Sequence, residues 1–138
     1  MNQTIIDLIS KYEVKGDFNY ATVTDDMIAE AEKSLGLKIP DQFVEYVKLY
    51  GYGGIGGIGV LGVGLDGSIV FRDVTLEYRE EGLPLNYIVI ENVDEWLECI
   101  DCDTGKIVSW DMGGGVQEDF DCFDDYILSQ MHDVIENM

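Results

Sequence analysis

The sequence has few basic residues. Its 138 residues include eight Lys and Arg against 28 Asp and Glu, so the formal net charge at pH 7 is −20. A surface that binds nucleic acid needs a basic footprint to displace counterions from the phosphates. This chain presents the opposite field, which argues against binding of DNA, RNA or an anionic membrane surface. The same field attracts cationic partners and speeds the encounter with them.

Histidine, cysteine and long apolar runs are also scarce. His132 is the only histidine; it lies on the last predicted helix, where a surface or half-buried histidine is favoured over a catalytic base. Three cysteines cannot complete a disulfide framework, and the Cys99/Cys102 pair lacks the second pair or the histidines that zinc requires. No apolar run is long enough to span a bilayer, and the first residues do not resemble a signal peptide. We therefore expect a cytoplasmic protein with reduced thiols, no metal and no cofactor.

The acidic excess is uneven along the chain. Residues 1–65 hold nine acidic and five basic residues, a net charge of −4, whereas residues 66–138 hold nineteen acidic and three basic residues, a net charge of −16. One interpretation is a self-repelling surface that maintains solubility or suits a salty cytoplasm. The concentration in one half favours the other interpretation, a surface built for a basic partner.

Hydrophobic residues make up 46% of the chain, enough for one packed domain over residues 1–138. Apolar periodicity, capping residues and turn signals predict helices at 4–14, 25–35, 41–50, 72–81 and 119–137. They predict strands at 58–63, 68–71, 86–92, 95–100 and 106–112, with Asp66-Gly67 as the turn of a first hairpin. This order of helices, antiparallel strands with one inserted helix, and a closing helix indicates an α+β fold, not βαβ alternation.

Residues 51–64 hold eight of the sixteen glycines. The pattern G-x-G-x-x-G occurs three times there, but a dinucleotide site needs a strand before it and a helix after it, and here a helix comes first. There is also no lysine of the kind found in a P-loop. We interpret the stretch as a backbone corner in which a helix passes into a strand packed close to it. The structural residues of this corner are Pro40, Gly51, Gly53, Gly54 and Gly59.

No pattern assigns catalysis. With 28 carboxylates, paired acids of the glycosidase kind are expected by chance. Asp101, Asp103 and Gly105 do not have the spacing of a calcium loop and are typical of a turn. We therefore expect a protein that is not an enzyme and has no catalytic residue.

Several motifs together resemble one family. The first part reads as a helix, then an "IP" pair, an aromatic helix, a "YG-x-GG" turn and a strand, carried by Ile39-Pro40, Phe43, Tyr46, Tyr50-Gly51, Gly53-Gly54 and Gly59. The second part is carried by 87–90, Asp103-Thr104-Gly105, 108–111 and 123–127. In this order they resemble the SUKH superfamily, immunity proteins related to the yeast cell-wall-assembly regulator. The resemblance covers about residues 24–136, and the first helix at 4–14 falls outside it.

The resemblance implies an α+β fold whose curved sheet is flanked by N-terminal helices and a C-terminal helix. It also implies that the chain binds and neutralises a polymorphic toxin domain of nuclease or deaminase type, and it brings no catalytic residues. A regulatory or scaffold module that docks a cellular protein is the alternative, and an enzyme acting on a small substrate is a third hypothesis. The toxin, the partner and the oligomeric state stay open.

Acidic residues of the second half are the candidates for binding a basic toxin, because charge governs the rate of encounter. These candidates are Asp66, Glu77, Glu80, Glu81, Asp94, Glu95, Asp101, Asp103, Glu118, Asp119 and Asp121. We expect the side chains of Trp96 and Trp110 to lie in the hydrophobic core. Aromatic residues dominate interface hot spots, however, so Tyr52 and Trp110 are the candidate anchors.

Overall fold

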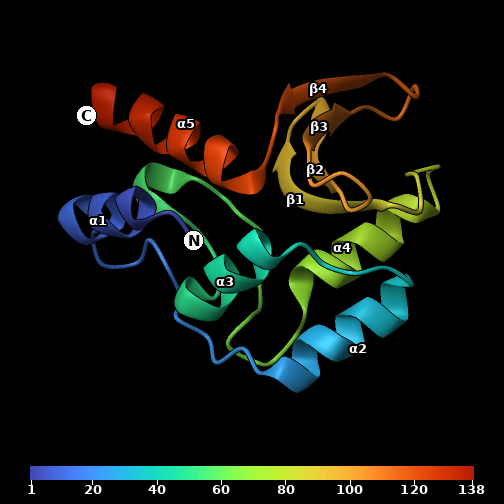
Figure 1. Cartoon of the computed structure of the whole chain (residues 1–138), viewed down its shortest axis with the longest axis horizontal. Coiled ribbons are helices and arrows are strands. Elements are labelled where there is room, and N and C mark those ends of the chain that lie inside the picture. Colours follow the sequence, from blue (N-terminus) through green and yellow to red (C-terminus); the bar gives the residue numbers. More distant parts are fainter.

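A computed structural model describes all of residues 1–138 and shows the expected α+β architecture (Figure 1). The elements in chain order are α1 (Gln3–Tyr12), α2 (Asp25–Leu35), α3 (Asp41–Tyr50), the 3-10 turn η1 (Ile55–Gly57), α4 (Val70–Arg79), β1 (Tyr87–Val93), β2 (Trp96–Asp101), β3 (Ile107–Trp110), β4 (Val116–Phe120) and α5 (Phe123–Glu136).

Local sequence signals determine the ends of the N-terminal helices. The side chain of Asn2 accepts a hydrogen bond from the backbone N–H of Thr4 and caps α1. Thr24 caps α2 in the same way, and Gly36 ends that helix in the left-handed conformation that glycine adopts without strain. Pro40 is the N-cap of α3. None of the five α-helices combines the length and the apolar character needed to cross a bilayer.

The four strands form an open antiparallel meander in the order β1-β2-β3-β4. Its pairing slips by one residue twice, once on β1 between Val89 and Glu91 and once at the β3–β4 pair between Ile107 and Val108. Each slip is a β-bulge, which bends a strand and redirects the side chains that follow it.

Helix α4 and the segment before it close the outer edge of β1. The hydroxyl of Thr75 on α4 accepts a hydrogen bond from the backbone N–H of Val89 (3.0 Å), and the N–H of Leu61 donates to the carbonyl of Ile90 (2.8 Å). These bonds satisfy backbone groups that an edge strand would otherwise leave free. No comparable segment covers β4, most of whose residues are exposed.

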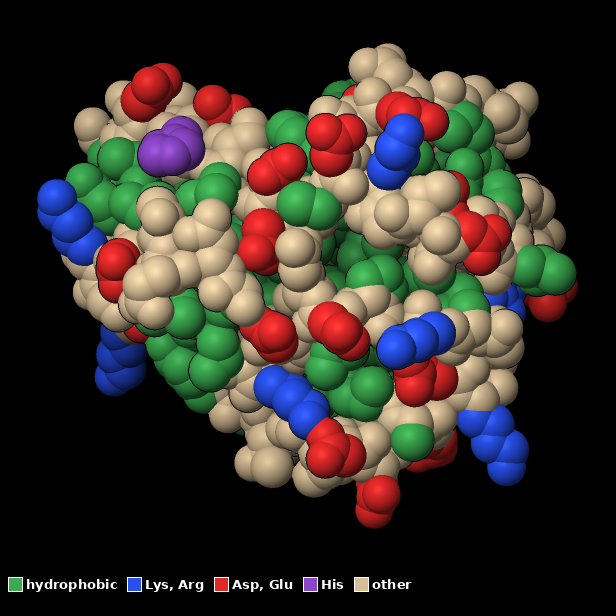
Figure 2. Space-filling view, viewed as in Figure 1, with side chains coloured by type: hydrophobic (Ala, Val, Ile, Leu, Met, Phe, Trp, Pro, Cys, Tyr) green, Lys and Arg blue, Asp and Glu red, His purple; other side chains and the backbone are tan.

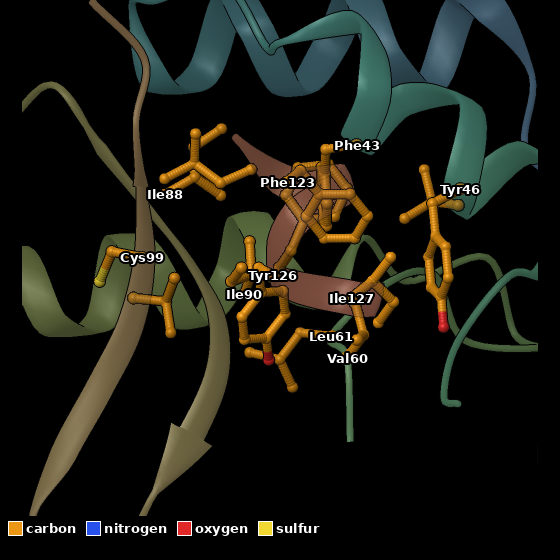
Figure 3. Packing of buried hydrophobic residues seen from close by; sticks show 14 of the residues in the cluster. Phe43, Tyr46, Val60, Leu61, Ile88, Ile90, Cys99, Phe123, Tyr126 and Ile127 are labelled. Carbon is orange, nitrogen blue, oxygen red and sulfur yellow. The ribbon is translucent and has the colours of Figure 1, made fainter. Parts of the chain in front are cut away.

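Both faces of the sheet are buried near β1, where α5 lies on one side and α4, with α2 beside it, on the other (Figure 1). Phe123 and Tyr126 of α5 point toward Ile88 and Ile90, while Phe43 of α3 closes the cluster from the helical side (Figure 3). The rings of Phe43 and Phe123 meet edge to face at 5.5 Å. The sheet and the helices thus share one hydrophobic core of 34 buried residues.

Two predicted strands are wrong. Residues 58–63 run extended but join no sheet, and the hairpin expected at Asp66-Gly67 is reduced to one isolated bridge between Val63 and Ile69. The turn forms as expected, but α4 starts at Val70, so no residues remain to extend a strand on that side.

The final helix starts later than predicted. Residues 116–120 form β4, and α5 begins at Phe123, not at residue 119. Asp119 and Asp121 therefore do not lie in the first turn of a helix. Phe120 fits the spacing of the helix, but it ends β4 and its ring contacts that of Tyr126 at 5.8 Å.

The glycine corner is a site of close backbone approach. A Cβ on Gly62 would lie 1.8 Å from the carbonyl oxygen of Gly51, and one on Gly53 would lie 2.2 Å from that of Asp17. Gly51 also has a φ of 79°, which favours glycine. The close contacts join the end of α3 to the extended segments around it, not to a strand of the sheet. Gly59 has open space around its Cα, so no contact there requires a glycine.

Candidate functional site

Basic residues neutralise little of the acidic half. Among residues 66–138, Arg72 pairs with Asp73, Lys106 pairs with Glu118, and Arg79 donates to backbone carbonyls of the helical layer. These are the three basic residues of that half. All three are engaged, so most of its nineteen carboxylates face solvent without a cation.

Two of the candidate acids stabilise turns. Asp66 accepts hydrogen bonds from the backbone N–H (3.0 Å) and hydroxyl (2.6 Å) of Ser68, and these bonds lower the pKa of Asp66. Asp101 accepts from the side chain of Asn86 (2.9 Å) and from the backbone N–H of Asp103 (3.0 Å). Asp side chains commonly form such hydrogen bonds in turns, so Asp66 and Asp101 have a structural role.

The other candidate acids, exposed except for the half-buried Asp119, fall in separate places. Glu77, Glu80 and Glu81 lie at the C-terminal end of α4, and Asp94 and Glu95 form the tight turn between β1 and β2. The structure therefore does not gather these five residues with the acids of β4.

Acids do gather where β4 passes into α5. A groove of about 300 Å³ there is lined by Glu118, Asp119, Phe120, Asp121 and Asp125. In Figure 2 the surface is hollowed at the top, between the lobe of α5 and the lobe of the sheet, and acidic side chains lie along this notch. Of the candidates, Glu118, Asp119 and Asp121 are the ones that the fold brings together.

Sequence reasoning missed two carboxylates, Glu91 and Glu98. The bulge on β1 turns Glu91 onto the face that carries Glu98 directly opposite, and the slip on β4 leaves Asp119 as an extra residue beside Phe120. Asp119 lies close enough to Glu98 to raise the pKa of Glu98. We call Glu91, Glu98 and Asp119 the carboxyl cluster. Strict alternation along regular strands does not predict it, because it depends on both bulges.

The members of the carboxyl cluster are bonded differently. Glu91 accepts hydrogen bonds at both oxygens, from the hydroxyl of Tyr126 and from the backbone N–H of Gly59 (3.3 Å). It therefore ties α5 and the glycine corner to the sheet. Glu98, only 8% exposed, accepts from the indole N–H of Trp96 (3.1 Å) at Oε1, while its Oε2 has no hydrogen-bond donor.

Glu98 is the most perturbed acid of the chain. Burial raises its pKa to about 7, and the nearby charges of Asp119 and Glu91 add to the effect, against the hydrogen bond from Trp96 that lowers it. A buried carboxyl with an unpaired oxygen and a pKa near neutrality is unfavourable for folding and marks a candidate functional group.

Of the two tryptophans, Trp110 lies in the core as expected and Trp96 does not. Trp110 is 3% exposed and packs in the core, so its ring is not available to a partner. Trp96, expected in the core, is 43% exposed. Tyr52 is half-buried and lines a hollow of about 470 Å³ beside the glycine corner, away from the carboxyl cluster.

The open end of the sheet combines apolar and acidic groups. Trp96, Met112 (62% exposed) and Val116 (51% exposed) are large hydrophobic side chains left uncovered there. A pocket of about 320 Å³ is lined by Trp96, Ser109, Trp110, Asp111, Gly115, Val116 and Gln117. Exposed apolar groups with acids beside them are the composition expected of a protein-binding surface.

The thiols and the histidine form no site. Cys99, Cys102 and Cys122 are free, and burial raises the pKa of Cys102 to about 12 and that of Cys99 still further. Such thiols are poor nucleophiles at neutral pH. His132 is exposed on α5, and no three His, Cys, Asp or Glu side chains are arranged to hold a metal ion.

A family model described as SUKH_5, SMI1-KNR4 cell-wall, matches residues 2–132. The chain belongs to this family. The match begins before α1, so that helix belongs to the family domain although the motifs in the sequence placed it outside. It also includes β4 and most of α5, the elements that carry the acidic groove.

Proposed function

We propose that this member of the SUKH family is a cytosolic immunity protein, which binds a basic toxin domain of nuclease or deaminase type and neutralises it. The activity proposed is binding, not catalysis. The observation that carries the proposal is the unneutralised charge of residues 66–138, where three engaged basic residues face nineteen acidic ones.

A toxin that acts on nucleic acid holds phosphates in a cationic cleft, and an acidic protein can occupy that cleft in their place. Long-range attraction raises the association rate, while a few well-packed aromatic and apolar anchors slow dissociation. The exposed Trp96, Met112 and Val116 supply such anchors beside the acids of the sheet. Charge and anchors on one surface favour this end of the molecule as the interface.

Co-expression tests the proposal. The domain to use is the C-terminal domain of the adjacent gene's product, expressed from an inducible promoter in a bacterial host. We expect the host to survive only when this protein is produced as well. If the domain is toxic alone and equally toxic with the protein present, immunity to that domain is wrong.

Two triple variants with equal charge change locate the binding surface. The first replaces the acids of the β4–α5 groove (Asp119→Asn, Asp121→Asn and Asp125→Asn), and the second replaces those at the end of α4 (Glu77→Gln, Glu80→Gln and Glu81→Gln). We expect the groove variant to lose protection and the α4 variant to keep it. Equal loss in both would mean that net charge matters but the proposed surface does not.

The alternative is a regulatory or scaffold module that docks a cellular protein, which the family description, naming the cell wall, favours. The two functions differ in what binds. A regulatory module retains its partner in cells without any toxin gene, and its deletion changes cell-wall or growth properties. Deletion of an immunity protein is harmless once the toxin gene is deleted too.

A further inference from the structure

We propose that the open end of the sheet holds a receptor for one arginine side chain of the partner, with the guanidinium on Glu98 and Asp119 and its plane against the ring of Trp96. The inference rests on the proposed function, since it names the chemistry by which the basic partner is recognised.

The carboxyl group of Glu98, the proposed hydrogen-bond acceptor, is buried away from water before any ligand binds. Glu98 is more than nine-tenths buried, and its Oε2 lacks a donor although Oε1 has one from Trp96. The carboxyl of Asp119, whose charge acts on Glu98, is an acceptor and not a donor when ionised. Two neighbouring carboxyl groups, of which Glu98 has an oxygen without a donor, suit a ligand that is cationic and carries several N–H groups in one plane, which describes a guanidinium.

The register of the sheet brings the walls of the site together. Glu98 lies opposite Ser109, which lies opposite Gln117, and Trp96 precedes Glu98 by two residues on the same face. Trp96, Ser109 and Gln117 all line the pocket of about 320 Å³, and Glu98 lies behind this lining, paired with Ser109. The guanidinium would enter from this pocket, beside the exposed ring of Trp96.

The ring of Trp96 favours arginine over lysine. Guanidinium groups stack on indole rings and bond carboxylates in a fixed fork, whereas the ammonium of lysine is a compact and strongly hydrated point charge. The indole N–H also holds Oε1 of Glu98, so ring and carboxylate are oriented together before a ligand arrives. No Lys or Arg of the chain pairs with Glu98 or Asp119, and Lys106, the basic residue closest in sequence to Glu98, pairs with Glu118.

Two peptides that differ only in the cation test the proposal, acetyl-Gly-Arg-Gly-amide and acetyl-Gly-Lys-Gly-amide. The chain has two tryptophans, so its ¹H–¹⁵N spectrum contains two indole signals, and Trp96→Phe identifies that of residue 96. We expect the arginine peptide, at 0.15 M salt, to shift the Trp96 signal to saturation and leave that of buried Trp110 in place. The lysine peptide should bind about tenfold more weakly, the loss expected without a bidentate bond and stacking.

Glu98→Gln and Glu95→Gln are matched variants, since each removes one negative charge from β2 or the turn before it, and only Glu98 is buried. We expect Glu98→Gln to weaken arginine binding at least about tenfold and Glu95→Gln to leave it unchanged. Equal shifts with both peptides, or full binding by Glu98→Gln, would show attraction to the net charge alone and overturn the proposal.

The pH dependence supplies a second readout. The groups that face Glu98 are Asp119 on β4, Glu91 on β1, Trp96 on its own strand and Tyr126 on α5. Because the guanidinium binds the ionised carboxyl, arginine binding should be about tenfold weaker at pH 6 than at pH 8, and the Glu98→Gln variant should lack this dependence.

The outcome for this site is separable from that for the proposed function. If the peptides fail to bind but the protein still protects cells from the toxin, the arginine site is wrong and the immunity function stands. If the peptides bind as expected and no toxin is neutralised, the site serves another arginine-bearing partner.

Discussion

Replacing Glu98 with glutamine should stabilise the protein, and more so at high pH. Glutamine keeps the shape of the side chain, and its amide oxygen can still accept from the indole N–H of Trp96. Its amide N–H₂ can donate to Asp119, which a carboxylate cannot do. The substitution thus removes a buried charge without creating a cavity.

The magnitude follows from the difference between two pKa values. The pKa of Glu98 is 4.5 in an exposed setting and about 7 in the folded protein. The folded state therefore holds the proton more tightly, so stability falls as the pH rises from 4.5 toward 7. At about 1.4 kcal/mol per pKa unit, ionised Glu98 costs up to about 3 kcal/mol at pH 8, and less than about 1 kcal/mol of this is present at pH 5.

Urea unfolding of the wild type and of Glu98→Gln at pH 5 and pH 8 measures this difference. We expect the gain from Glu98→Gln to be about 2 kcal/mol larger at pH 8 than at pH 5. Glu95→Gln, an exposed change of equal charge, should shift stability by less than about 0.5 kcal/mol at either pH. The same small effect for Glu98→Gln at both pH values would show that Glu98 is not a strained acid.

Three further predictions concern the fold and the charge. Gly62→Ala should destabilise the protein by about 3 kcal/mol in urea unfolding, because its Cβ would meet the carbonyl oxygen of Gly51. Gly59→Ala, with open space around it, should range from neutral to about 1 kcal/mol more stable, and an equal loss in both variants would contradict the close-approach argument. Thr75→Val should cost about 2 kcal/mol in the same assay, since it leaves the buried N–H of Val89 without an acceptor, and no change would mean that this bond adds nothing. The association rate with the toxin domain, measured by stopped flow, should fall steeply between about 0.05 and 0.5 M salt, because the Debye length is already as short as roughly 10 Å at 0.1 M. A rate that does not change with salt would mean that the acidic residues serve solubility alone.

Strong local signals predicted the helices and the central hairpin. The helices expected at 25–35 and 41–50 match α2 and α3 because a threonine cap, a proline and two glycines mark their ends. The hairpin of β2 and β3 follows from its predicted turn, where the backbone N–H of Gly105 donates to the carbonyl of Asp101 (2.7 Å). Such signals depend on neighbours in sequence, so a single chain suffices to identify them.

Tertiary context decided the elements that were wrong. Residues 58–63 are as apolar as a strand, but their backbone groups bond to Gly51 and Ile90 instead of forming a ladder. The exposed strand β4 carries Glu118 and Asp119, acids that also suit the first turn of a helix, and Phe120 continues the helical spacing. Neither conflict can be resolved without knowing which segment lies alongside.

The carboxyl cluster depends on two β-bulges, and for that reason the candidate acids named from sequence omitted its most perturbed member. A bulge is invisible in an alternating pattern, yet it changes the face on which every later residue of the strand lies. Asp119 was a candidate because of its charge, whereas Glu98 lies within the predicted strand 95–100 and was not among the candidates.

The Glu98→Gln variant can distinguish a structural role of the carboxyl cluster from a functional one. Replacing a residue that stabilises the fold should lower the free energy of unfolding, but the raised pKa of Glu98 predicts that Glu98→Gln increases it. If Glu98→Gln gains stability and loses arginine binding, Glu98 is retained despite its cost in folding free energy because it binds a cation. A partner arginine would supply the donor that Oε2 lacks and would lower the pKa of Glu98 toward its ordinary value, so binding should release a proton near pH 7. Calorimetry of the arginine peptide in buffers of different ionisation enthalpy measures that release, and binding with no proton released would contradict the pairing of guanidinium with Glu98.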